Sequence, residues 1–206
     1  AKIKAIKYET KIRDIEIHAH DDFGNAVENT MAAARAASGL WDRIYLSTTF
    51  LRIGERAGNA ETEKVIMNLY MHYGVRKFEG KLSKLTELAE LISRATGYVI
   101  PPNKAIVGAY AFAHESGIHT HGVLNDPATY EPYPPELVGN VRRLTIGKHS
   151  GKAIIKHKII EITGREPDAE TLARVVKEVK KLYEFGRKAS LKEEEFKKIL
   201  RDVGLI

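Results

Sequence analysis

The first part of this chain alternates twice between a strand pattern and a helical pattern, and this order restricts the fold more than any other feature. Residues 12–20 alternate apolar and polar side chains, and residues 43–50 are rich in β-branched and aromatic residues, as in half-buried strands. Helical patterns over residues 25–37 and 61–73 follow them, and each stops at a glycine. Strand–helix–strand–helix order is typical of parallel units, so the sequence predicts an α/β fold.

The pattern changes after the second helix. Apolar spacing predicts a linker helix over residues 82–96, whereas residues 103–145 show no period and contain several prolines. The chain then becomes helical again. We therefore predict three segments: two βα units in 1–80, a linker helix and an irregular subdomain in 81–146, and a small helical subdomain in 147–206.

The helical subdomain contains three predicted helix starts. Ser150 is expected to cap the first helix, and Asp168 is expected to cap the second. Ser190 and Glu193 have the spacing of a capping box ahead of a third apolar stripe.

Two βα units cannot enclose a parallel sheet by themselves, because a closed barrel of such units needs eight. We therefore expect the missing strands to lie either in another chain or in a longer polypeptide that includes these residues. For the same reason we expect no catalytic activity from these residues alone.

Composition excludes several classes of function. There is no cysteine, so any metal must bind through nitrogen and oxygen. The formal net charge is +6, but lysines interleave with glutamates, as in residues 178–188, which is typical of a solvated helix face. No apolar run is long enough to cross a membrane. We expect a cytoplasmic protein with neither a nucleic-acid nor a membrane partner, and the many charges with no glutamine favour a thermophilic source.

The sharpest local feature is a pair of histidines at the end of the first strand. His18 and His20 are two residues apart, so their side chains lie on one face of a strand. The carboxyl ends of barrel strands are where active sites assemble. The pair is therefore either a divalent-metal site or two inert side chains, and Asp21 or Asp22 is a candidate to orient an imidazole.

Three further motifs follow in order. The four motifs are HAHDDFG at 18–24, GERAGNA at 54–60, AFAHESGIH at 111–119 and GKHSGK at 147–152. Together they resemble the 2-isopropylmalate, homocitrate and citramalate synthase family, whose members condense acetyl-CoA with a 2-oxoacid.

This resemblance implies the fold and the metal site. It makes the first segment the last two βα units, seven and eight, of a TIM barrel. It also implies that His18 and His20 bind Zn²⁺, Mg²⁺ or Mn²⁺, together with an acidic ligand outside this chain. Asn59 matches a position near the metal, although a loop-capping role fits it as well. Acetyl-CoA enters as the co-substrate of the 2-oxoacid.

The resemblance also implies the catalytic groups and the assembly. His119 and Tyr130 match the candidate acid/base groups, although Tyr130 is also placed to pack. The segment that carries them works on the barrel of a partner subunit, so we expect a homodimer through residues 101–145 and a separate chain carrying the N-terminal barrel units. His114 and His121 are interpreted as structural.

Some residues depart from the family pattern. Leu51 and Arg52 stand where isopropylmalate synthases have Asn-Gly, and His121 stands where an aspartate is usual. Leu51 favours a homocitrate synthase, with 2-isopropylmalate synthase as the alternative and a non-catalytic relic of the same fold as a third possibility. Glu55 and Arg56 are either an ion pair that holds their loop or substrate contacts.

Overall fold

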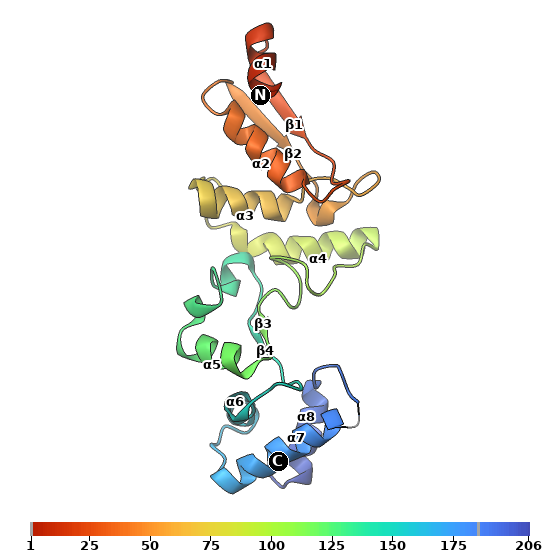
Figure 1. Cartoon of the computed structure of the whole chain (residues 1–206), viewed down its shortest axis with the longest axis vertical. Helices are drawn as coiled ribbons and strands as arrows, with labels where there is room; N and C mark the ends of the chain where they lie inside the picture. Colours follow the sequence, from red (N-terminus) through yellow and green to blue (C-terminus); the bar gives the residue numbers. More distant parts are fainter. Residues whose placement is uncertain (1, 185) are drawn as a thin grey trace. The chain divides into compact units, whose positions relative to one another are not determined.

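The computed structural model describes residues 2–184 and 186–206, which form two compact units (Figure 1). The first unit comprises residues 1–111 and 136–140, and the second comprises 112–135 and 141–206. The two units are defined by which residues pack together in space. They do not test the predicted division of the sequence into three segments, which stays a prediction. None of the helices in the described residues is long and apolar enough to cross a membrane.

The first unit contains the two predicted βα units. Its regular elements are α1 (Lys2–Glu9), β1 (Asp14–His18), α2 (Ala26–Ala37), β2 (Arg43–Ser47), η1 (Phe50–Arg52) and α3 (Thr62–Tyr73). The two strands pair in parallel, with His18 opposite Ser47, and α2 packs along them (Figure 1). The α/β class is therefore confirmed, whereas the place of these units in a barrel stays a prediction.

The first unit continues through η2 (Leu82–Lys84) and α4 (Leu85–Thr96), and residues 136–140 return to it. The Thr86 hydroxyl donates to the Val138 carbonyl at 2.7 Å, and the Asn140 amide donates to two carbonyls of the preceding loop. A Cβ on Gly139 would lie 2.1 Å from the Ser83 carbonyl oxygen. The close approach at this glycine lets the segment dock on α4.

The second unit corrects the prediction of an irregular segment. It contains β3 (Ala113–His114), α5 (Gly117–Asn125), η3 (Pro127–Thr129) and β4 (Arg143–Leu144), and β3 pairs with β4 in parallel. Helix α5 buries only Thr120 and Val123 and includes two glycines, so it has no apolar stripe of helical period to detect.

The rest of the second unit is the predicted helical subdomain, formed by α6 (Lys152–Thr163), α7 (Ala169–Glu184) and α8 (Glu193–Asp202). Its core is one cluster of aliphatic side chains with two aromatic ones. The fully buried members include Ile154, Ile155, Ile159, Val175 and Leu200.

Only one of the three predicted helix starts is correct. Asp168 caps α7 by accepting the Thr171 backbone N–H at 2.7 Å. The predicted capping box is wrong, because the carboxylate that accepts the backbone N–H of Lys192, at 2.7 Å, belongs to Glu195. The predicted cap at Ser150 is wrong as well, because Gly151 occupies the cap position of α6.

A buried lysine joins two buried glutamates in the first unit. Lys104 Nζ lies 2.6 Å from Glu61 Oε1 and 3.3 Å from Glu63 Oε1, and all three side chains are nearly inaccessible. Burial raises the pKa of Glu63. Burial also acts to raise the pKa of Glu61, but hydrogen bonds from Lys104 and Lys64 hold that pKa below its ordinary value. The cluster ties the loop after α4 to the start of α3.

We predict that Lys104→Met lowers the free energy of unfolding by roughly 3–5 kcal/mol, because it removes the cation beside the fully buried Glu63 and leaves Glu61 with Lys64 alone. Urea denaturation followed by circular dichroism measures the loss. The matched control is Lys84→Met, which removes an exposed ion pair with Glu87 and should leave the unfolding midpoint unchanged. Equal losses in the two variants would contradict a special role for the buried lysine.

Candidate metal centre and acid–base pair

The candidate metal site forms where the loop of residues 54–60 returns to the end of β1. The Asp21 backbone N–H donates to the Gly58 carbonyl at 2.9 Å, and the Ala60 N–H donates to the Ala19 carbonyl at 3.2 Å. These two bonds bracket an antiparallel bridge between His20 and Asn59. The return therefore places Asn59 against residues 40 positions earlier in the chain.

Three predicted site side chains meet there. The Asn59 amide nitrogen lies 3.2 Å from His18 Nε2 and 3.4 Å from His20 Nδ1, and the two imidazoles meet edge to face with centroids 4.9 Å apart. The other ring nitrogen of His18 lies 3.1 Å from the Ser47 hydroxyl on β2, which orients this ring. Asn59 is buried, whereas the His18 ring is exposed at the strand end.

The donor set fits a divalent cation. Imidazole nitrogen and amide oxygen are both metal ligands, and rotating the Asn59 amide by half a turn presents its oxygen to the same space. Within the described residues, no third His, Asp or Glu joins His18 and His20 in a group that could hold a metal ion.

Two glycines of the loop make this geometry possible. Gly58 has a φ of +88°, and a Cβ there would lie 1.8 Å from the Arg52 carbonyl oxygen. At Gly54 a Cβ would lie 2.0 Å from Asn59 Oδ1. Gly58 allows the turn, and Gly54 leaves room for the Asn59 amide, which faces the histidines.

Two of the three residues that depart from the family pattern have a strained backbone. Leu51 and Arg52 both adopt positive φ angles, of 58° and 65°. A positive φ costs roughly 1–2 kcal/mol for each residue that has a Cβ, whereas an Asn-Gly pair adopts the left-handed region readily. The cost is offset because the Leu51 side chain is buried and its N–H donates to the Glu63 carboxylate at 3.2 Å. Because it is buried, the Leu51 side chain has no surface for a substrate.

Asp21 and Asp22 do not orient an imidazole, so that expectation is wrong. The Asp21 carboxylate accepts the Ala26 N–H that opens α2, at 2.8 Å, and forms an ion pair with Arg52 at 3.1 Å. Asp22 forms two hydrogen bonds with Arg56, which hold the pKa of that carboxyl below its ordinary value. Of the two alternatives for Glu55 and Arg56, the ion pair between them does not form, because Arg56 pairs with Asp22.

The second unit brings His119 and Tyr130 together. His119 lies on α5, and the chain turns through η3 so that the Tyr130 ring stacks on the imidazole. The ring centroids are 4.2 Å apart and the planes are inclined by 28°. Both side chains are exposed, with Tyr130 at 39%, so both are accessible to a substrate.

A buried charged group beside this pair was missed by the sequence analysis. Glu131 accepts two hydrogen bonds from the Arg142 guanidinium, at 2.7 and 2.6 Å, and one from His114 Nε2 at 3.2 Å. The hydrogen bonds from Arg142 keep the pKa of Glu131 below its ordinary value, in spite of burial. His114 is structural, as predicted, and the only sequence signal for Glu131 was its position next to Tyr130.

The fourth motif supports the start of α5. The Ser150 hydroxyl donates to the Glu115 carbonyl at 3.1 Å, and the Glu115 carboxylate accepts from the Ser190 hydroxyl at 2.6 Å. A Cβ on Gly147 would lie 1.9 Å from the carboxyl carbon of Glu115. Gly147 and Ser150 of this motif therefore hold Glu115 in place, two residues before α5 begins.

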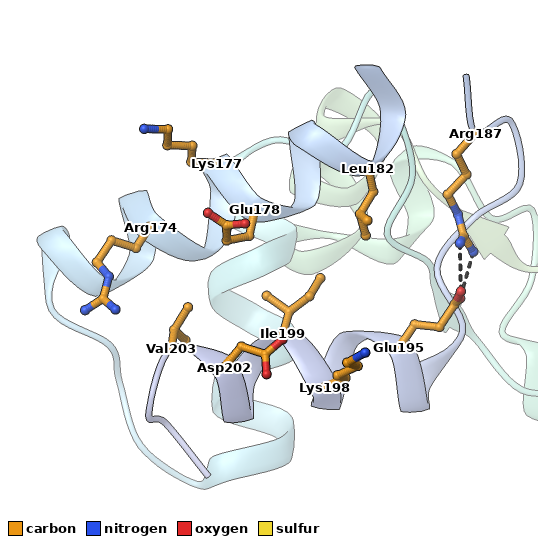
Figure 2. Close-up of a pocket in the computed structure, with 10 residues that line it drawn as sticks. All are labelled: Arg174, Lys177, Glu178, Leu182, Arg187, Glu195, Lys198, Ile199, Asp202 and Val203. Carbon is orange, nitrogen blue, oxygen red and sulfur yellow. Dashed lines mark hydrogen bonds and ion pairs between the residues drawn. The ribbon is translucent and has the colours of Figure 1, made fainter. Parts of the chain in front are cut away.

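An open groove between α7 and α8 lies outside both candidate sites (Figure 2). It has a volume of about 710 Å³ and is lined mainly by charged side chains over an apolar floor of Leu182, Ile199 and Val203. Arg187 and Glu195 form an ion pair within it (Figure 2). None of the candidate site residues lines this groove.

Comparison with known proteins matches both parts of the chain. A family model described as HMGL-like matches residues 1–92, and one described as homocitrate synthase post-HMGL domain-like matches residues 106–187. The chain is 43% identical over 189 residues to a putative (R)-citramalate synthase of Methanopyrus kandleri. It belongs to the acetyl-CoA-condensing 2-isopropylmalate and homocitrate synthase family.

The relatives in this family differ in their substrates. The chain is 43% identical over 191 residues to the 2-isopropylmalate synthase of Methanocaldococcus jannaschii, and 43% identical over 190 residues to homocitrate synthase AksA of M. kandleri. These matches and the citramalate synthase match cover 91–92% of the chain but only 35–45% of each relative. Because three activities occur at one level of identity, identity does not select the 2-oxoacid.

We predict that Gly54→Ala pushes the Asn59 amide away from the histidines. The added methyl group overpacks the loop, which should lower the free energy of unfolding by about 1–3 kcal/mol. The side-chain amide resonances of Asn59, which lie against two imidazole rings, should shift in a ¹⁵N-correlated NMR spectrum. The control is Gly151→Ala, since a Cβ there meets nothing within 4 Å at a φ of −89°. Unmoved Asn59 resonances would show that the glycine is not needed for space.

Proposed function

We propose that this chain forms part of an enzyme that condenses acetyl-CoA with a 2-oxoacid, of homocitrate synthase type. The observation that carries the proposal is the convergence of His18, His20 and Asn59 at the end of β1 in a chain of this family. The alternative within the family is 2-isopropylmalate synthase. The non-catalytic alternative is an assembly module of the same fold.

In this proposal His18 and His20 hold a divalent cation, such as Zn²⁺, Mg²⁺ or Mn²⁺, with Asn59 beside it. When bound, the cation supplies a Lewis acid for the oxo group of the 2-oxoacid. The hydrogen bond from His18 Nδ1 to Ser47 keeps Nε2 directed at the site. The acidic ligand and the groups that bind the oxoacid lie outside these 206 residues, in the same polypeptide or in a separate chain.

The acid and base roles fall to His119 and Tyr130. Condensation joins the methyl carbon of acetyl-CoA to the oxo carbon, so a proton leaves the methyl group and a proton reaches the oxo oxygen. Water then cleaves the thioester and frees the CoA thiol. An imidazole nitrogen can accept a proton and a phenol can donate one, and the exposed stacked pair offers both groups.

The choice of 2-oxoacid rests on few residues. Leu51 occupies a position where the homocitrate synthase pattern differs from that of isopropylmalate synthases, although its buried side chain acts on the loop and not on the substrate. A panel of 2-oxoglutarate, 2-oxoisovalerate and pyruvate separates homocitrate, isopropylmalate and citramalate formation.

We predict that His20→Ala abolishes metal-dependent condensation and leaves the fold intact. The assay supplies the rest of the barrel, a divalent metal, acetyl-CoA and the oxoacid panel, and a thiol reagent detects free CoA. This chain has no cysteine and so contributes no background. Residues 1–206 alone should show no turnover. Near-normal activity of His20→Ala would contradict the proposed metal site. Turnover by residues 1–206 alone would contradict the need for residues outside this chain.

We also propose that residues 101–145 form a homodimer in which His119 serves the barrel of the partner. Several apolar side chains of this segment are exposed, including Tyr110 at 61% and Ile118 at 74%, whereas Phe112 and Val123 are buried within their own unit. The expected mass from light scattering at micromolar concentration is near twice the chain's 23.1 kDa. A monomer across that range, with this segment resistant to protease, would overturn the dimer.

A further inference from the structure

We propose that Gly122, His114 and Glu131 are positioning residues that assemble the His119–Tyr130 pair within a single unit, before any partner or substrate binds. The proposal rests on the proposed function for its catalytic consequence, but the assembly itself is independent of that function. Gly122 provides space for the tyrosine ring. Glu131, held by Arg142 and His114, fixes the backbone that carries the tyrosine.

Gly122 lies one helical turn after His119, on the same face of α5. A Cβ at this position would lie 2.6 Å from Cε2 and 3.1 Å from Cδ2 of the Tyr130 ring. The ring therefore rests against the helix at a position where no side chain projects, and from there it covers the imidazole, with the ring centroids 4.2 Å apart. Any larger residue at 122 must push the ring outward.

Glycine is a poor helix former, so a glycine inside α5 calls for a structural reason. Glycine inside a helix costs about 0.5–1 kcal/mol relative to alanine. Gly122 has no positive φ that would require glycine, in contrast to the glycines that end helices α3 and α4. The close contact with Tyr130 is the feature of the structure that accounts for it.

Glu131 fixes the other side of the pair. It follows Tyr130 directly, and the N–H groups of both residues donate to the Pro127 carbonyl, at 3.1 and 2.9 Å. Its ionised carboxylate accepts from both Arg142 and His114, so His114 Nε2 carries the proton in this bond. With the carboxylate 3% exposed, these charge-assisted bonds leave Tyr130 little freedom to leave its position.

His114 connects this tether to the catalytic helix. It lies three residues before the start of α5, and its ring centroid is 6.4 Å from those of both His119 and Tyr130. Its neighbour Glu115 accepts a hydrogen bond from the Ser190 hydroxyl. Two separate contacts thus fix the residues that lead into α5, and His119 one turn later keeps its place against the ring.

The test compares Gly122→Ala with Gly117→Ala on the same helix. A Cβ at 117 meets its nearest atom at 3.5 Å, an ordinary contact, so this control adds the same methyl group without touching Tyr130. The first readout is the NMR shift of the His119 ring protons, which the stacked tyrosine ring shields. Tyr130→Leu supplies the value without the ring.

We expect Gly122→Ala to move the His119 ring protons toward the Tyr130→Leu value, with an unfolding midpoint equal to or above that of the unmodified chain. Gly117→Ala should leave the shifts in place. In the complete enzyme kcat should fall by about 10²-fold with KM little changed, because a displacement near 1 Å has that effect. Unmoved His119 shifts in a folded Gly122→Ala protein overturn the proposal.

Glu131→Gln tests the tether without changing volume, and it serves also if Gly122→Ala does not fold. It should move the same resonances in the same direction, and unmoved resonances overturn the tether. Moved shifts with unchanged kcat would support the positioning roles but overturn the acid–base role of the pair. The failure of the inference and the failure of the proposed function are therefore distinguishable.

Discussion

The return of residues 54–60 to the end of β1 is the interaction on which the first unit depends. Two backbone hydrogen bonds, from Asp21 to Gly58 and from Ala60 to Ala19, bring Asn59 to the paired histidines. The preceding strained pair, Leu51 and Arg52, is held by contacts to Glu63 and Asp21. Glu63 in turn shares Lys104 with Glu61, so the buried ion cluster supports, through Leu51, the start of the segment that leads to Asn59.

In the second unit, side-chain hydrogen bonds bring the candidate residues together. The two residues before Ser116, His114 and Glu115, are bonded to different partners on either side of the entry to α5. Arg142 keeps Glu131 ionised, and that carboxylate holds the turn that carries Tyr130. Each unit therefore assembles its own chemical groups: nitrogen and oxygen donors in the first, and an exposed imidazole–phenol pair in the second.

Two sequence-based predictions failed for the same physical reason. Ser190 and Glu193 have the spacing of a capping box, but Glu115 attracts the serine, and Arg187 holds Glu195 at the start of α8. Asp22 is taken by Arg56, 34 residues later in the chain. Local spacing predicts which groups can pair, whereas distant partners decide which of them do. Helix α5 was missed because it buries few residues and so has no periodic stripe.

The sequence by itself determined the α/β order and the parallel strands, and it proposed the candidate residues of both sites, because strand alternation, helical period and motif order depend on local positions. Only the tertiary structure decided that Asn59 meets both histidines, that Tyr130 stacks on His119, and that Glu131 anchors the stack. These contacts join residues up to 41 positions apart, and they depend on close approaches at Gly54 and Gly122. These close approaches can be found only in the tertiary structure, because the sequence does not show which distant residue packs against a given glycine.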